Sequence, residues 1–445
     1  MEDSVSAMLC TIISVQAMFD KSKHKRINLD QALSPEQLAL VRRVASAAAA
    51  RRVPLYLVGG FVRDLLMGIP GTDFDLVVEG AAIPLAQALV AQYGGRVTAH
   101  VRFGTAQWCL PGSGHRALDF ISTRSETYKH PAALPTVKAG SLIDDLMRRD
   151  FTINTLAIRL DGEHWGELRD ELGGQADLNK GLVRVLHPKS FMDDPTRLFR
   201  AVRYEQRCHF QIAPETLSLM PEAQQLIGSL SAERLRHELD LILEEEQAVG
   251  MLDRLAELDL LQPVHPALTW YAATRERFLT GARMLQEYHL KSMPVSTGKG
   301  LLGWHFWTMD FVSTNLESLE RRLHFHASLL KSMMAASSLF AELSSLVRLK
   351  PSEWVRRLDG MPLTAVYAVF LATPDHEVHQ DIFNYLETWR HIQPKTSGHD
   401  LIRRGLPPGP RYQQILGRLR EAWLDGELNT KSEETRLLDE LTKSV

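Results

Sequence analysis

The sequence predicts an α+β protein, in which a small mixed-sheet head is followed by an all-helical neck, body and tail. Three observations support this class. The chain has 445 residues, which exceeds one ordinary domain. Strand patterns alternate with helix patterns up to about residue 180, as in a sheet covered by helices. From Pro214 onward, apolar residues repeat with helical spacing.

These patterns divide the chain into five parts. We expect a leader over residues 1–34, a head over 35–180, a neck over 181–250, a body over 251–392 and a tail over 393–445. The leader is expected to be poorly specified or to form an amphipathic helix. Acidic residues precede its apolar run and no Lys or Arg does, which is the reverse of a signal peptide.

The head begins with a helix that has Ser34 as N-cap, Pro35 at the first helical position and Gln37 three residues after the cap. This helix is expected to run to about Arg52. The further elements predicted for the head are a strand at 55–58, a helix at 61–67 that stops at Gly68, a helix at 83–93, and strands at 101–108 and 117–121.

Two aspartates, Asp73 and Asp75, alternate with apolar residues just before a valine pair. Residues i and i+2 of a strand point to the same face, so the two carboxylates are expected side by side. Such like charges repel unless a cation lies between them, and a site of oxygen ligands suits Mg²⁺. The alternative is a strand end with two solvated acids. Asp119 is a candidate third ligand, or else the partner of Arg124.

Gly59 and Gly60 lie between the strand at 55–58 and the next helix, which carries Arg63. Glycine lets the backbone approach an anion, and the helix start offers free N–H groups, so this junction predicts phosphate binding. A phosphate site beside metal carboxylates is what the transfer of a nucleotidyl group from a triphosphate requires.

A second polar motif lies at 148–157, after a stretch at 124–146 that has no clear period. We expect the stretch at 124–146 to be a mobile loop or a surface connector. If 148–157 is helical, Asp150 and Asn154 share a face and can hydrogen-bond a ribose, while Arg149 can bind a triphosphate. The alternative is a capped helix with a solvated basic start.

A third motif has Asp194 as a helix N-cap before Pro195, and Arg197, Arg200 and Arg203 then follow at steps of three. A basic outer face on an amphipathic helix is the simpler interpretation. A carboxylate only accepts hydrogen bonds and a guanidinium only donates them, so Asp194 and Arg197 together match the edges of C and A. A bound G or U would leave buried polar groups unpaired, at roughly 1–3 kcal/mol each. If Asp194 serves as the cap, Asp193 reads the base instead.

The tail contains a turn rich in Gly and Pro that carries Arg403, Arg404 and Arg411. This is a local basic surface in a chain whose net charge is −3, and it predicts binding to a phosphate backbone. A solvated linker is the alternative.

The three cysteines are too widely spaced for a disulfide framework or a zinc site, so a reducing, cytoplasmic setting is expected. No membrane span is predicted, because no apolar run reaches ~20 residues.

These motifs resemble those of the class II tRNA nucleotidyltransferase and bacterial poly(A) polymerase family. The first resembled motif reads Leu57-Val58-Gly59-Gly60-Phe61-Val62-Arg63-Asp64, followed by Asp73-Phe74-Asp75. Residues 148–157 resemble the second motif, and 193–197 resemble the Glu-Asp-x-x-Arg motif, although Asp193 stands where Glu is commoner.

The resemblance implies a polymerase-β-like head in which the carboxylates of Asp73 and Asp75 bind the catalytic metal. It implies tRNA contacts at Arg403, Arg404 and Arg411, and a loop at 124–146 that helps to switch from C to A. The nucleotide-binding residues that it implies are Gly59, Gly60, Arg63, Arg149, Asp150, Asn154, Asp194, Arg197, Arg200 and Arg203.

The expected activity is template-independent addition of CCA to tRNA from CTP and ATP with Mg²⁺. Rival hypotheses are an enzyme that adds only A, a poly(A) polymerase, and a non-catalytic RNA-binding relative. The chain has no strongly basic C-terminal extension, which disfavours poly(A) synthesis, and the intact acidic and arginine motifs disfavour a non-catalytic role. The sequence does not separate CCA addition from A addition, and it does not fix the oligomeric state.

Overall fold

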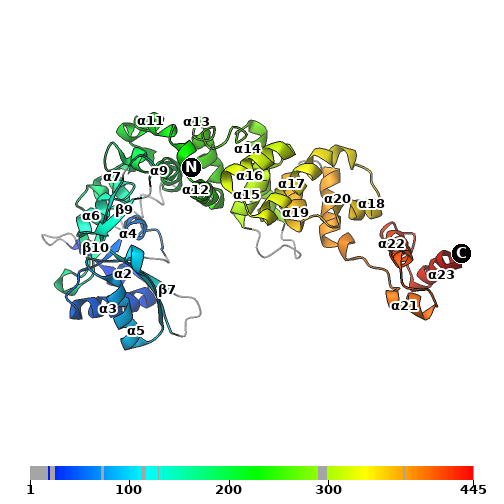
Figure 1. Ribbon diagram of the computed structural model, residues 1–445, viewed down its shortest axis with the longest axis horizontal. Helices are drawn as coiled ribbons and strands as arrows, with labels where there is room; N and C mark the ends of the chain where they lie inside the picture. The colour runs from blue at the N-terminus through cyan, green and yellow to red at the C-terminus, as the bar shows by residue number, and fades with distance from the viewer. Residues whose placement is uncertain are drawn as a thin grey trace. The chain divides into compact units, whose positions relative to one another are not determined.

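The computed structural model describes residues 19–20, 26–71, 75–111, 117–128, 130–133, 135–288, 298–373 and 376–443. The chain forms two compact units, Met1–Leu230 and Ser231–Val445 (Figure 1). The first unit contains a mixed sheet with helices, and the second is helical, so the predicted α+β class is confirmed. The five predicted domain boundaries stay predictions.

The described residues of the first unit contain a nine-stranded sheet with the order β1-β2-β11-β10-β3-β4-β7-β6-β5. Strands β4 and β7 are parallel and the other neighbours are antiparallel, which makes the sheet mixed as predicted. The strands are β1 (Phe19–Asp20), β2 (Arg26–Ile27), β3 (Leu55–Val58), β4 (Asp75–Val78), β5 (Arg96–His100), β6 (Thr105–Cys109), β7 (Ala117–Ser122), β10 (Ala157–Arg159) and β11 (Glu167–Arg169).

The two faces of this sheet pack against different helices. Leu55 and Leu57 of β3 face the core formed with α3 (Pro35–Ala50), α4 (Gly60–Leu66) and α5 (Ala82–Tyr93). Tyr56 and Val58 face the opposite way, toward α6 (Leu142–Met147). This alternation leaves the α6 face of the sheet for polar side chains at the strand ends.

Helix α3 begins as predicted, with a capping box between Ser34 and Gln37. The Gln37 side chain also donates to the carbonyl of Gly71 at 2.8 Å. The start of α3 therefore holds the chain just before β4, the strand that carries Asp75.

Part of the predicted leader belongs to the head. Strand β2 pairs with β11, and Leu29 of helix α2 (Leu29–Ala32) is buried in the main core together with Leu33. Residues 26–34 thus contain a short strand and a short helix, and their apolar side chains contribute to this core. Residues 1–18 and 21–25 lie outside the described residues.

The predicted irregular loop at 124–146 contains regular structure. Strands β8 (Arg124–Thr127) and β9 (Thr136–Ala139) form an antiparallel hairpin, and α6 follows it. Residues 129 and 134 lie outside the described residues. Neither short strand of the hairpin has the apolar alternation that makes a strand recognisable in a sequence.

The strand predicted at 101–108 begins later than expected. Residues Val101–Phe103 form a 3-10 turn, η1, and strand β6 starts at Thr105.

The remaining elements of the first unit lead from the sheet toward its end. Helix α9, which carries the arginines of the third motif, is the longest of them. The elements are α7 (Gly174–Lys180), β12 (Leu182–Val183), α8 (Ser190–Asp193), α9 (Thr196–Arg207), β13 (Gln211–Ile212), α10 (Pro214–Leu217) and α11 (Met220–Gln224).

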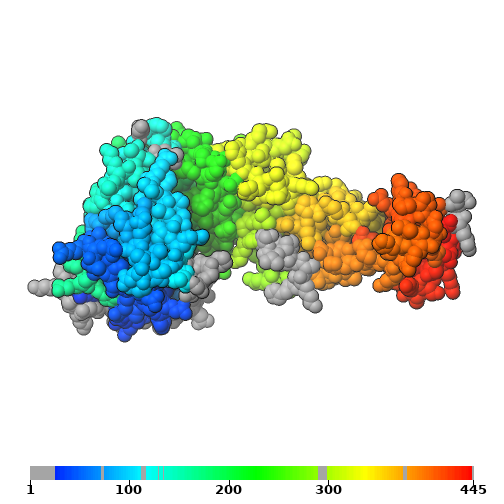
Figure 2. Space-filling view, turned by 60° about the horizontal axis from the view of Figure 1, so that its bottom comes forward, coloured from blue at the N-terminus to red at the C-terminus, as the bar shows by residue number. Residues whose placement is uncertain are grey.

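In the second unit the colour changes gradually from green to red, so helices that follow one another in sequence lie near one another (Figure 2). No helix in the described part of the chain is long and apolar enough to cross a membrane. The helices are α12 (Ala232–Glu244), α13 (Ala248–Glu257), α14 (Ala272–Glu287), α15 (Lys299–Thr308), α16 (Ser313–Leu323), α17 (Ala327–Glu342), α18 (Pro351–Leu358), α19 (Leu363–Ala372), α20 (His376–Glu387), α21 (Gly398–Arg403), α22 (Pro410–Leu424) and α23 (Lys431–Lys443).

Candidate active site

The junction between β3 and α4 forms the predicted glycine turn. Gly59 has φ +72°, a backbone conformation that strains residues with a side chain. A Cβ atom at Gly59 would also lie 2.5 Å from Nη1 of Arg149. Glycine at position 59 is therefore favoured by the turn, and a side chain there would also displace the guanidinium of Arg149.

The structure brings Asp75 and Asp119 together. Asp75 is the first residue of β4, and it pairs in register with Asp119 on the parallel strand β7. Register neighbours on adjacent strands point to the same face of the sheet, and both side chains are exposed. Gln107 of β6 donates to Oδ1 of Asp119 at 3.1 Å. Arg124, the alternative partner predicted for Asp119, donates to Glu126 instead, at 2.9 Å.

These carboxylates fit a divalent cation by the chemistry of their oxygen atoms. Neighbouring strands lie about 4.8 Å apart, so Asp75 and Asp119 place two acids close enough to share a hard cation. Asp73 lies outside the described residues, and its position next to Asp75 stays a prediction. Within the described ranges, no group of three His, Cys, Asp or Glu residues is placed to hold a metal ion.

Arg149 lies over the glycine turn and is held at both ends of its guanidinium. Nη1 donates to the carbonyl of Asn154 at 3.4 Å, and Nη2 donates to Oδ2 of Asp145 at 3.1 Å. The Nε atom is buried and has no hydrogen-bond partner among the described residues. A fixed cation with an unused donor beside a glycine turn suits an added anion such as a triphosphate.

Asp150 and Asn154 are in contact, and they lie at a 3-10 turn, η2 (Thr152–Asn154), rather than on the helix considered in the sequence analysis. Asn154 Nδ2 donates to Oδ1 of Asp150 at 2.9 Å, and Arg200 donates to Oδ2 from Nε at 2.9 Å and from Nη2 at 2.6 Å. Burial alone would raise the pKa of Asp150, but Arg200 and Asn154 outweigh burial and hold this pKa below its usual value. Both oxygens of Asp150 thus have protein partners, and its contact with a ribose stays a prediction.

Arg63 has a structural position that the sequence did not indicate. Its side chain is 2% exposed, Nη1 donates to Oδ1 of Asn154 at 2.7 Å, and Nε donates to Asp64 at 2.8 Å. The guanidinium also lies over the Tyr204 ring, 4.8 Å from its centroid. The guanidinium is enclosed by α4, η2 and α9, and the predicted contact between Arg63 and a nucleotide stays a prediction.

Helix α9 begins at Thr196, so Pro195 rather than the predicted Asp194 occupies its N-cap position, and Asp194 contacts the first turn from one residue further back. Its Oδ1 accepts hydrogen bonds from the Thr196 backbone N–H at 3.0 Å and from Oγ1 at 2.6 Å. Arg197 is 5% exposed, and it donates to Oγ of Ser190 at 2.5 Å and to the carbonyl of Arg148 at 2.8 Å. The predicted presentation of Asp194 and Arg197 to a base stays a prediction.

The other arginines of α9 are also held within the protein. Arg200 forms an ion pair with Asp150, and its predicted role in nucleotide binding stays a prediction. Arg203 is buried, and its guanidinium lies 5.6 Å from the centroid of the Tyr204 ring. The stripe of arginines is therefore not the solvated basic face of the simpler interpretation.

Two acidic residues that the sequence analysis did not single out hold the arginines of this site. Asp145 is fully buried and accepts hydrogen bonds from Arg148 and Arg149, while Glu126 of β8 accepts from Arg124 and Arg148. The spacing of Asp145, three and four residues before the two arginines, is a helical ion-pair signal in the sequence. No sequence pattern indicated Glu126.

The arginines of the tail lie beside acidic groups or carbonyls. Arg403 pairs with Asp400, Arg404 pairs with Asp439, and Arg411 donates to the carbonyl of Leu441 at 3.2 Å. The Arg403 side chain remains 77% exposed. The predicted role of these arginines in RNA binding stays a prediction.

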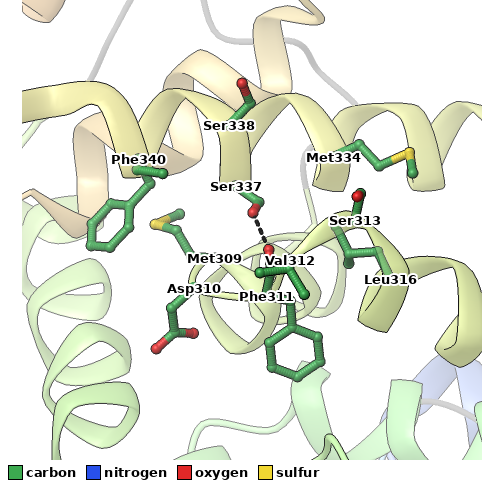
Figure 3. Close-up of a pocket in the computed structure, with 11 residues that line it drawn as sticks. Met309, Asp310, Phe311, Val312, Ser313, Leu316, Met334, Ser337, Ser338 and Phe340 are labelled. Atoms are coloured by element: carbon green, nitrogen blue, oxygen red, sulfur yellow. Dashed lines mark hydrogen bonds between the residues drawn. The ribbon is translucent and has the colours of Figure 1, made fainter.

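A cavity of about 560 Å³ in the second unit differs from the site in the head (Figure 3). Its lining comes from the segment after α15 and from α16 and α17, and it is largely apolar, with Met309, Phe311 and Met334 among its residues. Ser337 donates to the carbonyl of Phe311 at 2.5 Å, and Asp310 is paired with Arg277 at 3.0 Å. The described lining thus lacks the arrangement of arginines and exposed carboxylates found around Gly59.

Two family models match the chain. The poly(A) polymerase head domain matches residues 55–184, which include the glycine turn, Asp75, Asp119 and Arg149. The model described as "Probable RNA and SrmB- binding site of polymerase A" matches residues 209–271. The fold and the site therefore define a nucleotidyltransferase head of the poly(A) polymerase type.

Curated relatives extend the similarity along the chain. An A-adding tRNA nucleotidyltransferase of Halalkalibacterium halodurans is 32% identical over 87% of this chain and 88% of the relative. One of Geobacter sulfurreducens is 34% identical over 92% of this chain, which spans about half, 47%, of that relative. A CC-adding tRNA nucleotidyltransferase of Deinococcus radiodurans is 38% identical over 50% of this chain and 59% of the relative.

Solved structures agree with this similarity. A CCA-adding enzyme in apo form II has a TM-score of 0.80 and 29% identity, covering 94% of this chain and 98% of the other. The Thermotoga maritima CCA-adding enzyme complexed with tRNA has a TM-score of 0.75 and 28% identity, covering 94% and 97%. The chain belongs to the tRNA nucleotidyltransferase and bacterial poly(A) polymerase family, as the resemblance of its motifs predicted.

Proposed function

We propose that this protein adds C and A nucleotides from CTP and ATP to the 3′ end of tRNA, without a template, and so completes the CCA end. The observation that carries the proposal is Arg149, fixed over Gly59, in the same head that pairs Asp75 with Asp119. The tRNA-acting relatives and the CCA-adding structural neighbours support it.

In the proposed reaction, the terminal 3′ oxygen of the tRNA forms a bond to the α-phosphorus of the triphosphate. The bond between the α- and β-phosphates breaks, and pyrophosphate leaves. Gly59 lets the phosphates approach the backbone, and Arg149 neutralises part of their charge from a fixed position. These residues thereby orient the triphosphate for attack.

Asp73, Asp75 and Asp119 are the residues that would hold a divalent cation, and their oxygen atoms suit Mg²⁺. When it is bound, such an ion activates the 3′-hydroxyl and stabilises the leaving pyrophosphate. Asp75 and Asp119 pair in register on neighbouring strands, and neighbouring carboxylates repel each other. A cation bound between them would relieve this repulsion.

Selection of C and A is assigned to the start of α9. The contacts of Arg197 with Ser190 and Arg148 fix the direction of its guanidinium, and a fixed donor can discriminate between base edges. Asp194 supplies the acceptor in this proposal, although its Oδ1 also contacts the first turn of α9. Asp193 remains the alternative acceptor.

Addition of A alone is the second candidate, and one observation favours it. The relatives that match most of this chain are named A-adding tRNA nucleotidyltransferases, whereas the CC-adding relative matches 50% of this chain. The base edges of C and A present the same donor and acceptor pattern, so the site itself does not distinguish these two activities.

The deciding experiment supplies purified protein with tRNA lacking CCA, tRNA ending in C, and tRNA ending in CC, each with CTP, ATP or both. We expect use of CTP on the first two substrates and one A on the third, followed by a stop. The stop is expected because tail arginines such as Arg403 hold the tRNA and limit the advance of its 3′ end. A addition on the CC-ended tRNA alone supports the second candidate. Long A tracts would make the protein a poly(A) polymerase, and no incorporation would make it a non-catalytic relative.

A further inference from the structure

A buried carboxylate links the candidate nucleotide site to the neighbouring hairpin. Asp145 lies on α6, and none of its side chain is exposed. Its Oδ1 accepts hydrogen bonds from Arg148, from Nε at 2.9 Å and from Nη2 at 2.8 Å, while Oδ2 accepts from Arg149 Nη2 at 3.1 Å. One carboxylate therefore binds two consecutive arginines, one on each oxygen.

The Arg149 branch of this arrangement leads to the glycine turn. Asp145 holds one end of the guanidinium and the carbonyl of Asn154 holds the other, so Nη1 lies against Gly59. A long arginine side chain has many rotamers, and two anchors select the one that lies over the turn. Without Asp145, Arg149 would keep only the longer contact of 3.4 Å with Asn154.

The Arg148 branch leads to the hairpin and to the start of α9. Nη1 of Arg148 donates to Oε1 of Glu126 on β8 at 3.4 Å, and the carbonyl of Arg148 accepts from Arg197 at 2.8 Å. Glu126 also accepts from the hydroxyl of Tyr128 at 3.1 Å. Burial raises the pKa of Tyr128 to about 12, with Glu126 as the next cause, so this hydroxyl remains a donor at neutral pH.

We propose that Asp145 is a positioning residue, which orients Arg149 over the triphosphate. This inference rests on the proposed function for its substrate, a nucleoside triphosphate. Loss of Asp145 is therefore expected to weaken triphosphate binding.

The first test measures equilibrium binding of ATP to the full chain without tRNA, together with steady-state kinetics. Asp145→Asn removes the charge, and we expect it to weaken ATP binding and raise KM by at least ~10-fold, with a smaller change in kcat. Asp145→Glu keeps the charge and is expected to recover part of the loss. A purely structural role would not give this split between KM and kcat.

Asp144→Asn is the matched control, because Asp144 is the preceding residue on the same helix and is exposed. Its carboxylate accepts from the backbone N–H and the hydroxyl of Ser141, both at 2.8 Å, and it touches neither arginine in these contacts. We expect this variant to bind ATP within about twofold of the wild type, since an exposed cap contributes about 1 kcal/mol to the helix and nothing to the site. Equal ATP affinity of the wild type and Asp145→Asn would overturn the proposal.

Glu126→Gln is a second control, because Glu126 accepts hydrogen bonds from Arg124, Arg148 and Tyr128 and in these contacts does not touch Arg149. We expect this variant to bind ATP within about twofold of the wild type. A loss of ATP affinity as large as that of Asp145→Asn would overturn the specific role of Asp145. If Asp145→Asn does not fold, as judged by circular dichroism, a folded Asp145→Ser variant replaces it, and wild-type ATP affinity in that variant would overturn the role of Asp145.

Failure of the proposed function has a separate signature. A wild-type protein that binds ATP but adds no nucleotide to any tRNA would disprove that function, while the ATP-binding comparison would still decide the role of Asp145. A wild-type protein that binds no triphosphate would overturn both.

Discussion

The arginines of the head and those of the tail are held in different ways. Arg63, Arg197 and Arg200 are buried or half-buried, and each has several partners or a two-donor contact with one carboxylate. In the tail, Arg403 and Arg418 each pair with one acid, Asp400 and Glu427 respectively. Most of the Arg403 side chain is exposed.

This difference separates two uses of the same side chain. A buried arginine with several partners has one orientation and is costly to remove, because its partners are left unpaired. An exposed ion pair contributes about 0–1 kcal/mol, and its partners can rearrange. The head arginines thus define geometry, whereas the tail arginines provide local charge. Both groups look alike as basic stretches of sequence.

The largest effect that we expect comes from the candidate metal-binding acids of the head. Asp75→Ala should lower nucleotide incorporation by ~10³-fold or more, because the oxygen ligands of the metal are lost. Binding of tRNA, measured by filter retention, should stay within about twofold. Glu163→Ala, which also removes an exposed acid from the head, should leave both quantities unchanged. Near wild-type turnover in Asp75→Ala would show that Asp75 is not part of the active site.

Replacement of a buried arginine tests whether the head arginines contribute more to stability than the exposed arginines of the tail. Arg63→Ala should lower the free energy of unfolding by about 3 kcal/mol, since Asp64 and Asn154 would lose a buried partner. Arg403→Ala is the exposed counterpart, with an expected loss below about 0.5 kcal/mol. Urea titration of the full chain measures both. Similar losses for the two variants would show that burial does not distinguish these arginines.

The role of Arg197 in selection is tested by the fidelity of incorporation. Arg197→Ala should raise misincorporation of G or U relative to C and A by ~10-fold, because the discriminating donor is lost. Arg207→Ala, at the exposed end of the same helix, is the control. An unchanged ratio among the four triphosphates in a folded Arg197→Ala protein would argue against base reading by this residue.

The smallest effect is expected in the tail. Arg403→Ala and Arg404→Ala should each weaken tRNA binding by ~2–5-fold at low salt and reduce the slope of log K against log salt by about 1. Arg356→Ala, an exposed arginine of α18 that pairs with Glu421, is the control. If Arg403→Ala and Arg404→Ala have the same salt slope as the control Arg356→Ala, the two tail arginines do not contact phosphates.

Several elements were predictable because their signals are local. The capping box at Ser34 places the start of α3, and the glycines after β3 place the turn at Gly59. The hairpin of β8 and β9 was not predictable, because its strands lack alternating apolar residues. Asp194 illustrates an intermediate case, since its contact with the helix start was expected but Pro195 occupies the N-cap position.

The glycine turn and the start of α3 could be predicted from the sequence, because each depends on residues a few positions apart. The pairing of Asp75 with Asp119, the position of Arg149 against Gly59 and the burial of Arg63 are visible only in the folded chain. These contacts depend on strand register and on the packing of helices against the sheet. Residue spacing along the chain does not specify either of them, because many registers and packings satisfy the same local pattern.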